Sequence, residues 1–216
     1  TSILIMAAVL CAPAALRAAE PLRIGVAGVS HGHIHEVISK AHRGDFTVVG
    51  VWEANDSLRA ATHLHDKVDG ALFYADLDRM LDQTQPEAIV AFGPVYDHLQ
   101  VVEACAPRGI HVMVEKPLAV SVEHAHRIAD LARRYGIIVM TNYETTWYAT
   151  NDEAFRLVRT GVIGEITRMN IFDGHQGPVE IGCGPEFLAW LTDPKLNGGG
   201  AVMDFGCYGA NLATKM

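Results

Sequence analysis

The stretch Ile110-His111-Val112-Met113-Val114-Glu115-Lys116-Pro117 decides the fold that the sequence predicts. It begins as a mostly apolar run of strand length and ends at a glutamate, a lysine and a proline. Proline fixes a turn, so Lys116 stands at the carboxyl end of a predicted buried strand. Because open α/β sheets bind ligands at this edge, we expect Glu115 and Lys116 to lie in a functional site. For the tripeptide alone, a surface turn without a function is the alternative.

Apolar runs and polar helical segments alternate along residues 22–142. Besides Ile110–Val114, the predicted strands are Leu22–Ala27, Phe46–Trp52, Ala71–Tyr74, Ala88–Phe92 and Ile137–Thr141. Short strands joined by helices are typical of a parallel sheet with helices on both faces. We therefore predict an α/β fold with a Rossmann-type, doubly wound parallel sheet over residues 20–142. Right-handed crossovers bring the carboxyl ends of the strands to one edge, where we expect Gly28, Glu53, Phe92, Gly93, Pro94, Glu115, Lys116 and Asn142.

The turn Gly28-Val29-Ser30-His31-Gly32 follows the first strand and indicates a dinucleotide site. A glycine turn lets backbone N–H groups approach a pyrophosphate, and the following helix start favours negative charge. Glu53 ends the second strand, where an acidic residue binds the ribose hydroxyls. An acidic side chain disfavours a 2′-phosphate, so we expect NAD rather than NADP. The turn has Ser30 where a second glycine is usual, and it is one residue short.

The pattern changes after Asn142, and we predict that residues 143–216 begin a second α/β domain. A helix over Asn151–Thr160 precedes a strand over Glu165–Phe172, and Gly198-Gly199-Gly200 opens another helix. On that helix Asp204, Tyr208 and Asn211 share one face, since they are four and three positions apart. Such side chains can hold the hydroxyls of a polyol, and a phenol can relay a proton. An ordinary polar helix face is the alternative.

Together these motifs resemble the Gfo/Idh/MocA family, which includes glucose–fructose oxidoreductase and inositol dehydrogenase. The resemblance rests on Gly28, Glu53, Gly93-Pro94, His98, Glu115-Lys116-Pro117, Trp190, Asp193-Pro194, Gly198-Gly199-Gly200, Asp204 and Tyr208. It implies a Rossmann domain followed by an α/β domain built on a mostly antiparallel sheet, which forms the substrate face and the oligomer contact. It also implies NAD(P)-dependent hydride transfer to or from a sugar or cyclitol hydroxyl.

The resemblance also assigns residues. Lys116 would be the catalytic lysine, with Asp204 and Tyr208 beside it; the family most often has histidine at the position of Tyr208, although tyrosine occurs in the glucose–fructose oxidoreductase branch. The cofactor would contact Gly28, Ser30, His31, Gly32, Glu53, Phe92, Gly93, Pro94, His98, Glu115, Lys116 and Asn142. The substrate would contact Lys116, Trp190, Asp204, Tyr208 and Asn211. The alternatives are an NAD-dependent glycoside hydrolase that oxidises its sugar transiently, and a sugar- or nucleotide-binding protein without catalysis.

The N-terminal residues and the charge bear on location and partners. Ile3–Leu16 is an apolar run too short to span a bilayer, and the Ala-rich segment after it is typical of an export signal. We therefore expect residues 1–19 to be a signal remnant of a longer, periplasmic protein that is not held in the membrane once mature; a buried N-terminal helix is the alternative. Export favours a tightly bound NAD, and the full-length protein is expected to be a homo-oligomer. A net charge of −8 with 17 Lys+Arg argues against nucleic acid as a partner.

Histidines alternate with other residues in three places, at His31, His33 and His35, at His63 and His65, and at His124 and His126. Metal sites use such spacings. The first set overlaps the predicted phosphate loop, however, and the others fall on polar helical segments. The sequence therefore predicts no metal site.

Overall fold

The computed structural model describes residues 20–216, so the predicted signal segment lies outside the described residues. Six strands, paired in parallel, form one sheet in the order β3-β2-β1-β4-β5-β6. The strands are β1 Leu22–Ala27, β2 Phe46–Trp52, β3 Phe73–Tyr74, β4 Ala88–Ala91, β5 His111–Glu115 and β6 Val139–Asn142. This order is that of a Rossmann fold. The predicted doubly wound parallel sheet is confirmed.

Helices connect consecutive strands. They are α1 Ile34–Lys40, α2 Asp56–Ala61, α3 Leu77–Thr84, α4 His98–Cys105 and α5 Val122–Tyr135. Short polar side chains start them: Asp76 accepts the backbone N–H of Arg79 at 2.7 Å, and Ser121 accepts that of His124 at 3.2 Å. Gly136 ends α5 in the left-handed conformation, with φ of 67°. Local capping chemistry thus fixes the element boundaries.

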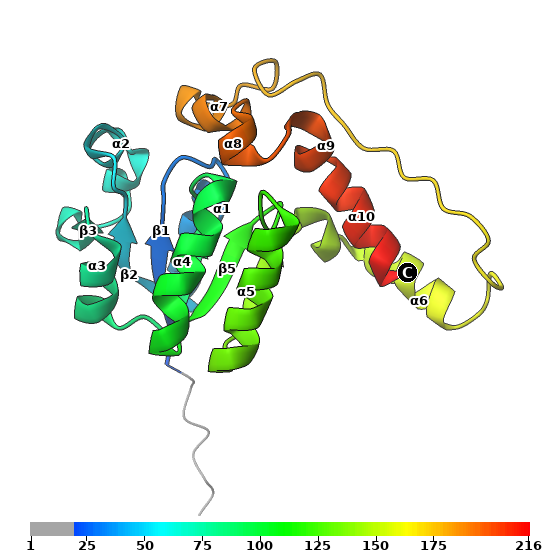
Figure 1. Cartoon of the computed structure of the whole chain (residues 1–216), viewed down its shortest axis with the longest axis horizontal. Coiled ribbons are helices and arrows are strands. Elements are labelled where there is room, and N and C mark those ends of the chain that lie inside the picture. The colour runs from blue at the N-terminus through cyan, green and yellow to red at the C-terminus, as the bar shows by residue number, and fades with distance from the viewer. Residues whose placement is uncertain (1–19) are drawn as a thin grey trace, which may run out of the picture.

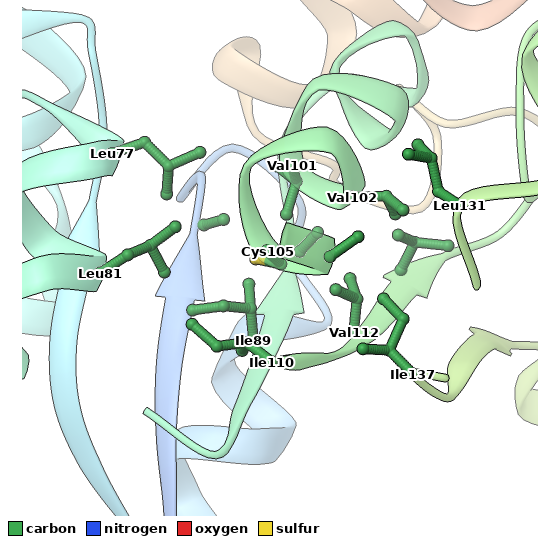
Figure 2. Close-up of a cluster of buried hydrophobic side chains, with 14 of the residues drawn as sticks. Leu77, Leu81, Ile89, Val101, Val102, Cys105, Ile110, Val112, Leu131 and Ile137 are labelled. Atoms are coloured by element: carbon green, nitrogen blue, oxygen red, sulfur yellow. The ribbon is translucent and has the colours of Figure 1, made fainter. Parts of the chain in front are cut away.

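The core lies on both faces of the sheet. Figure 2 shows the larger cluster, in which α3, α4 and α5 pack on the strands through Leu81, Val102 and Leu131. On the other face, Ile34 and Ile38 of α1 pack on β1, β2 and β4. A strand covered on both faces needs an almost continuous apolar sequence, which explains the runs in the sequence. Each fully buried aliphatic side chain contributes about 1.5–3 kcal/mol.

The second part of the chain is helical in the described residues. Its helices are α6 Ala149–Arg159, α7 Pro185–Leu191, α8 Pro194–Asn197, α9 Gly200–Asp204 and α10 Gly206–Lys215. The described residues contain no antiparallel sheet, and the predicted strand Glu165–Phe172 is wrong, because this segment has no regular secondary structure. In Figure 1 it runs outside α10, away from the sheet. An alternating segment forms a strand only beside a partner that takes its hydrogen bonds.

Helices α7 and α8 lie over the edge at which the strands end (Figure 1). A small apolar cluster of Val95, Phe187, Trp190 and Leu191 joins them to the turn after β4. Among the described residues, no helix is long and apolar enough to cross a bilayer. The second part of the chain thus covers the edge where the sequence places the functional residues.

Candidate active site

Two turns meet at the centre of this edge, one after β1 and one after β4. Gly28 has φ of 81°, and a Cβ built on it would lie 2.5 Å from the backbone nitrogen of Gly93. Only glycine combines this conformation with this close approach. The predicted glycine turn therefore joins the ends of β1 and β4 and leaves room at the edge for a ligand.

The first pocket at this edge has a volume of about 260 Å³. Its lining includes Gly28, Ser30, Glu53, Gly93, Pro94, Asp97, His98, Glu186 and Trp190. The Glu53 carboxylate accepts the backbone N–H groups of Val29 at 3.2 Å and Asn55 at 2.9 Å. Burial, and then the Glu53 charge, raise the pKa of Asp97. This pocket combines the glycine turn with a fixed carboxylate at the end of β2.

Ser30 has a role that the sequence did not indicate. Its hydroxyl oxygen accepts a hydrogen bond from the indole Nε1 of Trp190 at 2.9 Å, in a buried position. Ser30, which stands where the dinucleotide-binding turn usually has a second glycine, therefore connects α7 to this turn through a hydrogen bond. The sequence assigned Trp190 to the substrate, whereas the structure places it in the lining of the first pocket and not of the second.

The second pocket, of about 380 Å³, adjoins the first at Glu186. Lys116 reaches it from the end of β5, and its ammonium forms an ion pair with the Asp204 carboxylate. The same ammonium donates to the backbone oxygen of Asp204 at 3.2 Å and lies 5.3 Å from the centre of the Tyr208 ring. The structure thus brings the three predicted catalytic residues together from two distant parts of the chain.

Tyr208 is held as a neutral phenol. Burial raises its pKa, and nearby carboxylates, Glu144 first among them, raise it further. A phenol in this state keeps its proton and can donate it in a hydrogen bond. Tyr208 is therefore suited to hold an oxygen of a ligand in the second pocket.

Glu115 is fully buried and contacts His33, which lines the second pocket. Its Oε2 lies 3.1 Å from Nδ1 of His33, and its Oε1 accepts from the Asn142 amide at 2.7 Å. Burial raises the pKa of Glu115, but the His33 hydrogen bond and the charge of neighbouring histidines hold it below its usual value. Burial lowers the pKa of His33, yet Glu115 holds it above its usual value. Asn142 thus fixes a carboxylate beside the pocket, as its place at the end of β6 suggests.

Other predicted residues take different positions. Asn211 is outside the lining of the second pocket, and its Oδ1 accepts the Thr146 hydroxyl at 2.8 Å. The predicted single helix is broken at Phe205 into α9 and α10, so the spacing of four and three no longer gives one face. The Phe92 side chain belongs to the core, and its carbonyl accepts the backbone N–H of His31 at 2.9 Å. His98 donates from Nδ1 to the Leu118 carbonyl at 3.1 Å, and burial lowers its pKa to about 4.

The second pocket also contains residues that the sequence analysis missed. Glu144 follows β6 by two positions, and Phe205 interrupts the helix after the glycines; both line the pocket with His33. Glu144 could have been found from its place just beyond the last strand. Phe205 could not, since its position depends on where α9 ends.

Comparison with known proteins identifies the family. Residues 22–143 match the profile "Oxidoreductase family, NAD-binding Rossmann fold", and residues 152–216 match the "GFO/IDH/MocA C-terminal domain". The chain belongs to the Gfo/Idh/MocA family. A dTDP-3,4-didehydro-2,6-dideoxy-alpha-D-glucose 3-reductase of Streptomyces antibioticus is 32% identical over 87% of this chain and 54% of its own length. The D-glucoside 3-dehydrogenase of Escherichia coli is 26% identical over 87% of this chain and 52% of its own.

Solved structures of this family share the fold. An inositol dehydrogenase homolog from Azotobacter vinelandii, complexed with NAD+, has a TM-score of 0.75 and 23% identity over 93% of this chain and 54% of its own. Aldose-aldose oxidoreductase from Caulobacter crescentus has a TM-score of 0.70 and 23% identity over 90% of this chain and 57% of its own. The chain spans about half the length of the curated relatives it matches.

Proposed function

We propose that this protein is an NAD-dependent oxidoreductase that moves a hydride between a sugar or cyclitol carbon and the nicotinamide ring. The observation that carries the proposal is the ion pair between Lys116 and Asp204 in a pocket that adjoins the glycine turn. A buried lysine held by a carboxylate beside a dinucleotide-binding edge is placed to exchange a proton with a reacting hydroxyl.

The first pocket fits the dinucleotide. The close approach of Gly28 and Gly93 leaves backbone rather than side chains where a pyrophosphate would lie, and Glu53 is positioned for ribose hydroxyls. Glu53, Asp97 and Glu186 all line this pocket, and three carboxylates oppose the additional charge of a 2′-phosphate. These side chains support NAD over NADP.

Lys116, Tyr208 and Asp204 have separate roles in the proposed reaction. When bound, the cofactor supplies the hydride acceptor or donor. In its neutral amine form Lys116 takes the proton of the sugar hydroxyl during oxidation and becomes an ammonium, and this ammonium returns the proton to the oxygen during reduction. Tyr208 donates a hydrogen bond to the same oxygen, since its raised pKa keeps it protonated. Asp204 positions the Lys116 ammonium through the ion pair.

The names of the relatives support a more specific substrate. A 3-reductase of a glucose-derived nucleotide sugar and a D-glucoside 3-dehydrogenase are both among them. We therefore propose position 3 of a glucose-type sugar or glycoside as the reacting carbon. The second candidate, hydrolysis of a glycoside through its transient oxidation, follows from the same chemistry, because a ketone at position 3 acidifies the neighbouring C–H.

The N-terminal sequence supports a proposal about location. Its apolar run and the Ala-rich segment after it are typical of an export signal, so we propose that the full-length protein works in the periplasm. Because an exported protein has little access to cytoplasmic NAD, we also propose that it holds its NAD tightly. We further propose that the full-length protein is a homo-oligomer. Fractionation of cells that express the full-length gene tests the location. Denaturing the isolated protein and assaying the supernatant for NAD tests the retention of the cofactor.

The experiment that tests the function uses the purified full-length protein and follows the absorbance of reduced nicotinamide. The panel contains glucose, cyclitols, alkyl glucosides and an aryl glucoside. A rise in reduced nicotinamide with a sugar, glycoside or cyclitol supports the oxidoreductase. Release of the aryl group without net reduction supports the hydrolase instead. No reduction and no release would contradict both.

A further inference from the structure

Three side chains form a compact cluster beside the second pocket, and two of them, His31 and His33, line it. One ligand atom each from His31, His33 and Glu115 lie within 4.8 Å of one another. Nε2 of His31 and Nδ1 of His33 are 3.9 Å and 3.1 Å from the same Oε2 of Glu115. Ligands around a tetrahedral zinc ion stand roughly 3.3 Å apart, given metal–ligand bonds of 2.0–2.2 Å. The distances in the cluster bracket that value.

A second observation points to a ligand at this place. Nε2 of His31 is buried and has no hydrogen-bond partner in the described part of the chain, and the His31 side chain is only 4% exposed. It is aimed at the same carboxylate oxygen as His33. Buried polar atoms in proteins nearly always have a partner, so this one calls for an explanation. A metal ion between the imidazoles and the carboxylate supplies the missing partner.

The surroundings hold the three side chains in place. Asn142 donates to Oε1 of Glu115 at 2.7 Å, and the backbone N–H of Lys116 donates to Oε2 at 3.2 Å, which holds Oε2 beside the histidines. The ring of Phe187 packs edge-on against His31, with 4.7 Å between ring centres. Partners of this kind orient metal ligands and increase their affinity. The cluster is therefore preorganised around one point.

Two hydrogen bonds within the cluster oppose metal binding. Nδ1 of His31 accepts the backbone N–H of His33 at 3.2 Å, which leaves the ring proton on Nε2 in the metal-free protein. Ligation through Nε2 moves this proton to Nδ1 and breaks that hydrogen bond. The ion also displaces the proton between Nδ1 of His33 and Oε2 of Glu115, which are 3.1 Å apart without it. The loss of these two hydrogen bonds is small beside the free energy with which a zinc site binds its ion.

We propose that His31, His33 and Glu115 form a binding site for a divalent first-row transition-metal ion, with zinc as the expected occupant. Two imidazoles and one carboxylate leave coordination positions open, as in catalytic zinc sites. His31 and His33 line the second pocket and not the first, whose lining holds Gly28 and Glu53. The open positions face the pocket that contains Lys116, where an oxygen of the substrate can coordinate. Hydride transfer to NAD requires no metal, so the site is independent of the proposed function.

The test measures metal binding rather than activity. Untagged full-length protein is dialysed against a chelator and titrated with Co2+, whose visible spectrum reports its coordination, and zinc is measured by elemental analysis after exposure and gel filtration. The expected result is one ion per chain with a d–d spectrum of a site of low coordination number. His33→Gln is expected to weaken binding at least tenfold. His35→Gln, an exposed histidine of the same segment, is the matched control and is expected to bind like the unaltered protein.

Two results would overturn the proposal. One is the absence of stoichiometric uptake by the unaltered protein. The other is equal affinity in His33→Gln and His35→Gln, which would assign the bound metal to surface histidines elsewhere. His33 is 28% exposed, so its replacement disturbs the core little, and circular dichroism verifies that both variants fold. A failure of the sugar panel leaves this test unaffected, since uptake and spectrum do not depend on turnover.

Discussion

The sheet-forming part of the molecule, residues 22–142, and the helical part, residues 143–216, differ in how much apolar packing fixes their side chains. Residues 22–142 bury apolar side chains in large clusters on both faces of the sheet. The helical part shares only a small cluster with that framework, and it leaves Phe172 94% and Val202 82% exposed. Yet it supplies Asp204 and Tyr208 to the second pocket. The rigid part therefore defines the position of Lys116, and a few specific contacts bring the other groups to it.

The largest effect is expected at the point where the two parts meet. Lys116→Met removes the group that exchanges the proton, so the rate of hydride transfer should fall by about 10²–10⁴-fold. The dissociation constant for NAD should change little, because the dinucleotide is held mainly by the first pocket. Single-turnover absorbance and calorimetry measure the two quantities. A variant that retains the rate would remove Lys116 from the chemistry.

The next effect tests the rigid framework. Gly28→Ala places a Cβ 2.5 Å from a backbone nitrogen at φ of 81°, so we expect a loss of more than about 2 kcal/mol in the free energy of unfolding and weaker NAD binding. Gly109→Ala is the control, since Gly109 has φ of 70° but open space around it. It should lose only about 1–2 kcal/mol and leave NAD binding unchanged. Equal losses in urea titrations would show that the contact between the turns is unimportant.

A smaller effect is expected at the contact that holds α7. Ser30→Ala leaves the buried Nε1 of Trp190 without an acceptor, at a cost of about 1–3 kcal/mol. Amide hydrogen exchange should accelerate in α7 while the sheet stays protected. Ser39→Ala, at an exposed serine of α1, should change neither. Unchanged exchange in α7 would mean that other contacts hold this helix.

The last effect is spread over a range of pH. Burial lowers the pKa of His98 to about 4 from 6.5, although the hydrogen bond to the Leu118 carbonyl and the charge of Glu115 act in the opposite direction. Between pH 6.5 and about 4, His98 is protonated in the unfolded chain but neutral in the folded chain. The free energy of unfolding therefore falls as the pH drops below 6.5, by up to about 1.4 kcal/mol per pH unit. His98→Gln should reduce this slope. Chemical denaturation at a series of pH values measures it, and an unchanged slope would contradict the assignment.

The same comparison explains what the sequence could predict. The bounds of β1 and β2 match the predicted strands, because an apolar run between polar helical segments reports burial on both faces directly. The strand order is that of the predicted Rossmann-type sheet. The segment Glu165–Phe172 alternates as a strand does, but alternation does not show whether a partner strand is present.

The site was predictable where its residues end strands. Gly28, Glu53, Glu115, Lys116 and Asn142 could all be placed at one edge for that reason. The link between Ser30 and Trp190 joins residues far apart in the chain, and no local pattern encodes it. The cluster of His31, His33 and Glu115 was missed for the same reason, since the carboxylate comes from another strand.

The central claim is that Lys116 and Asp204 act as one unit although they come from different parts of the chain. A double-mutant cycle with Lys116→Met and Asp204→Asn, read out as the single-turnover rate of nicotinamide reduction, tests it directly. If Asp204 acts through Lys116, its replacement slows the reaction in the unaltered protein and has almost no further effect once Lys116 is gone. Equal slowing by Asp204→Asn in both backgrounds would contradict the claim and assign Asp204 an independent role.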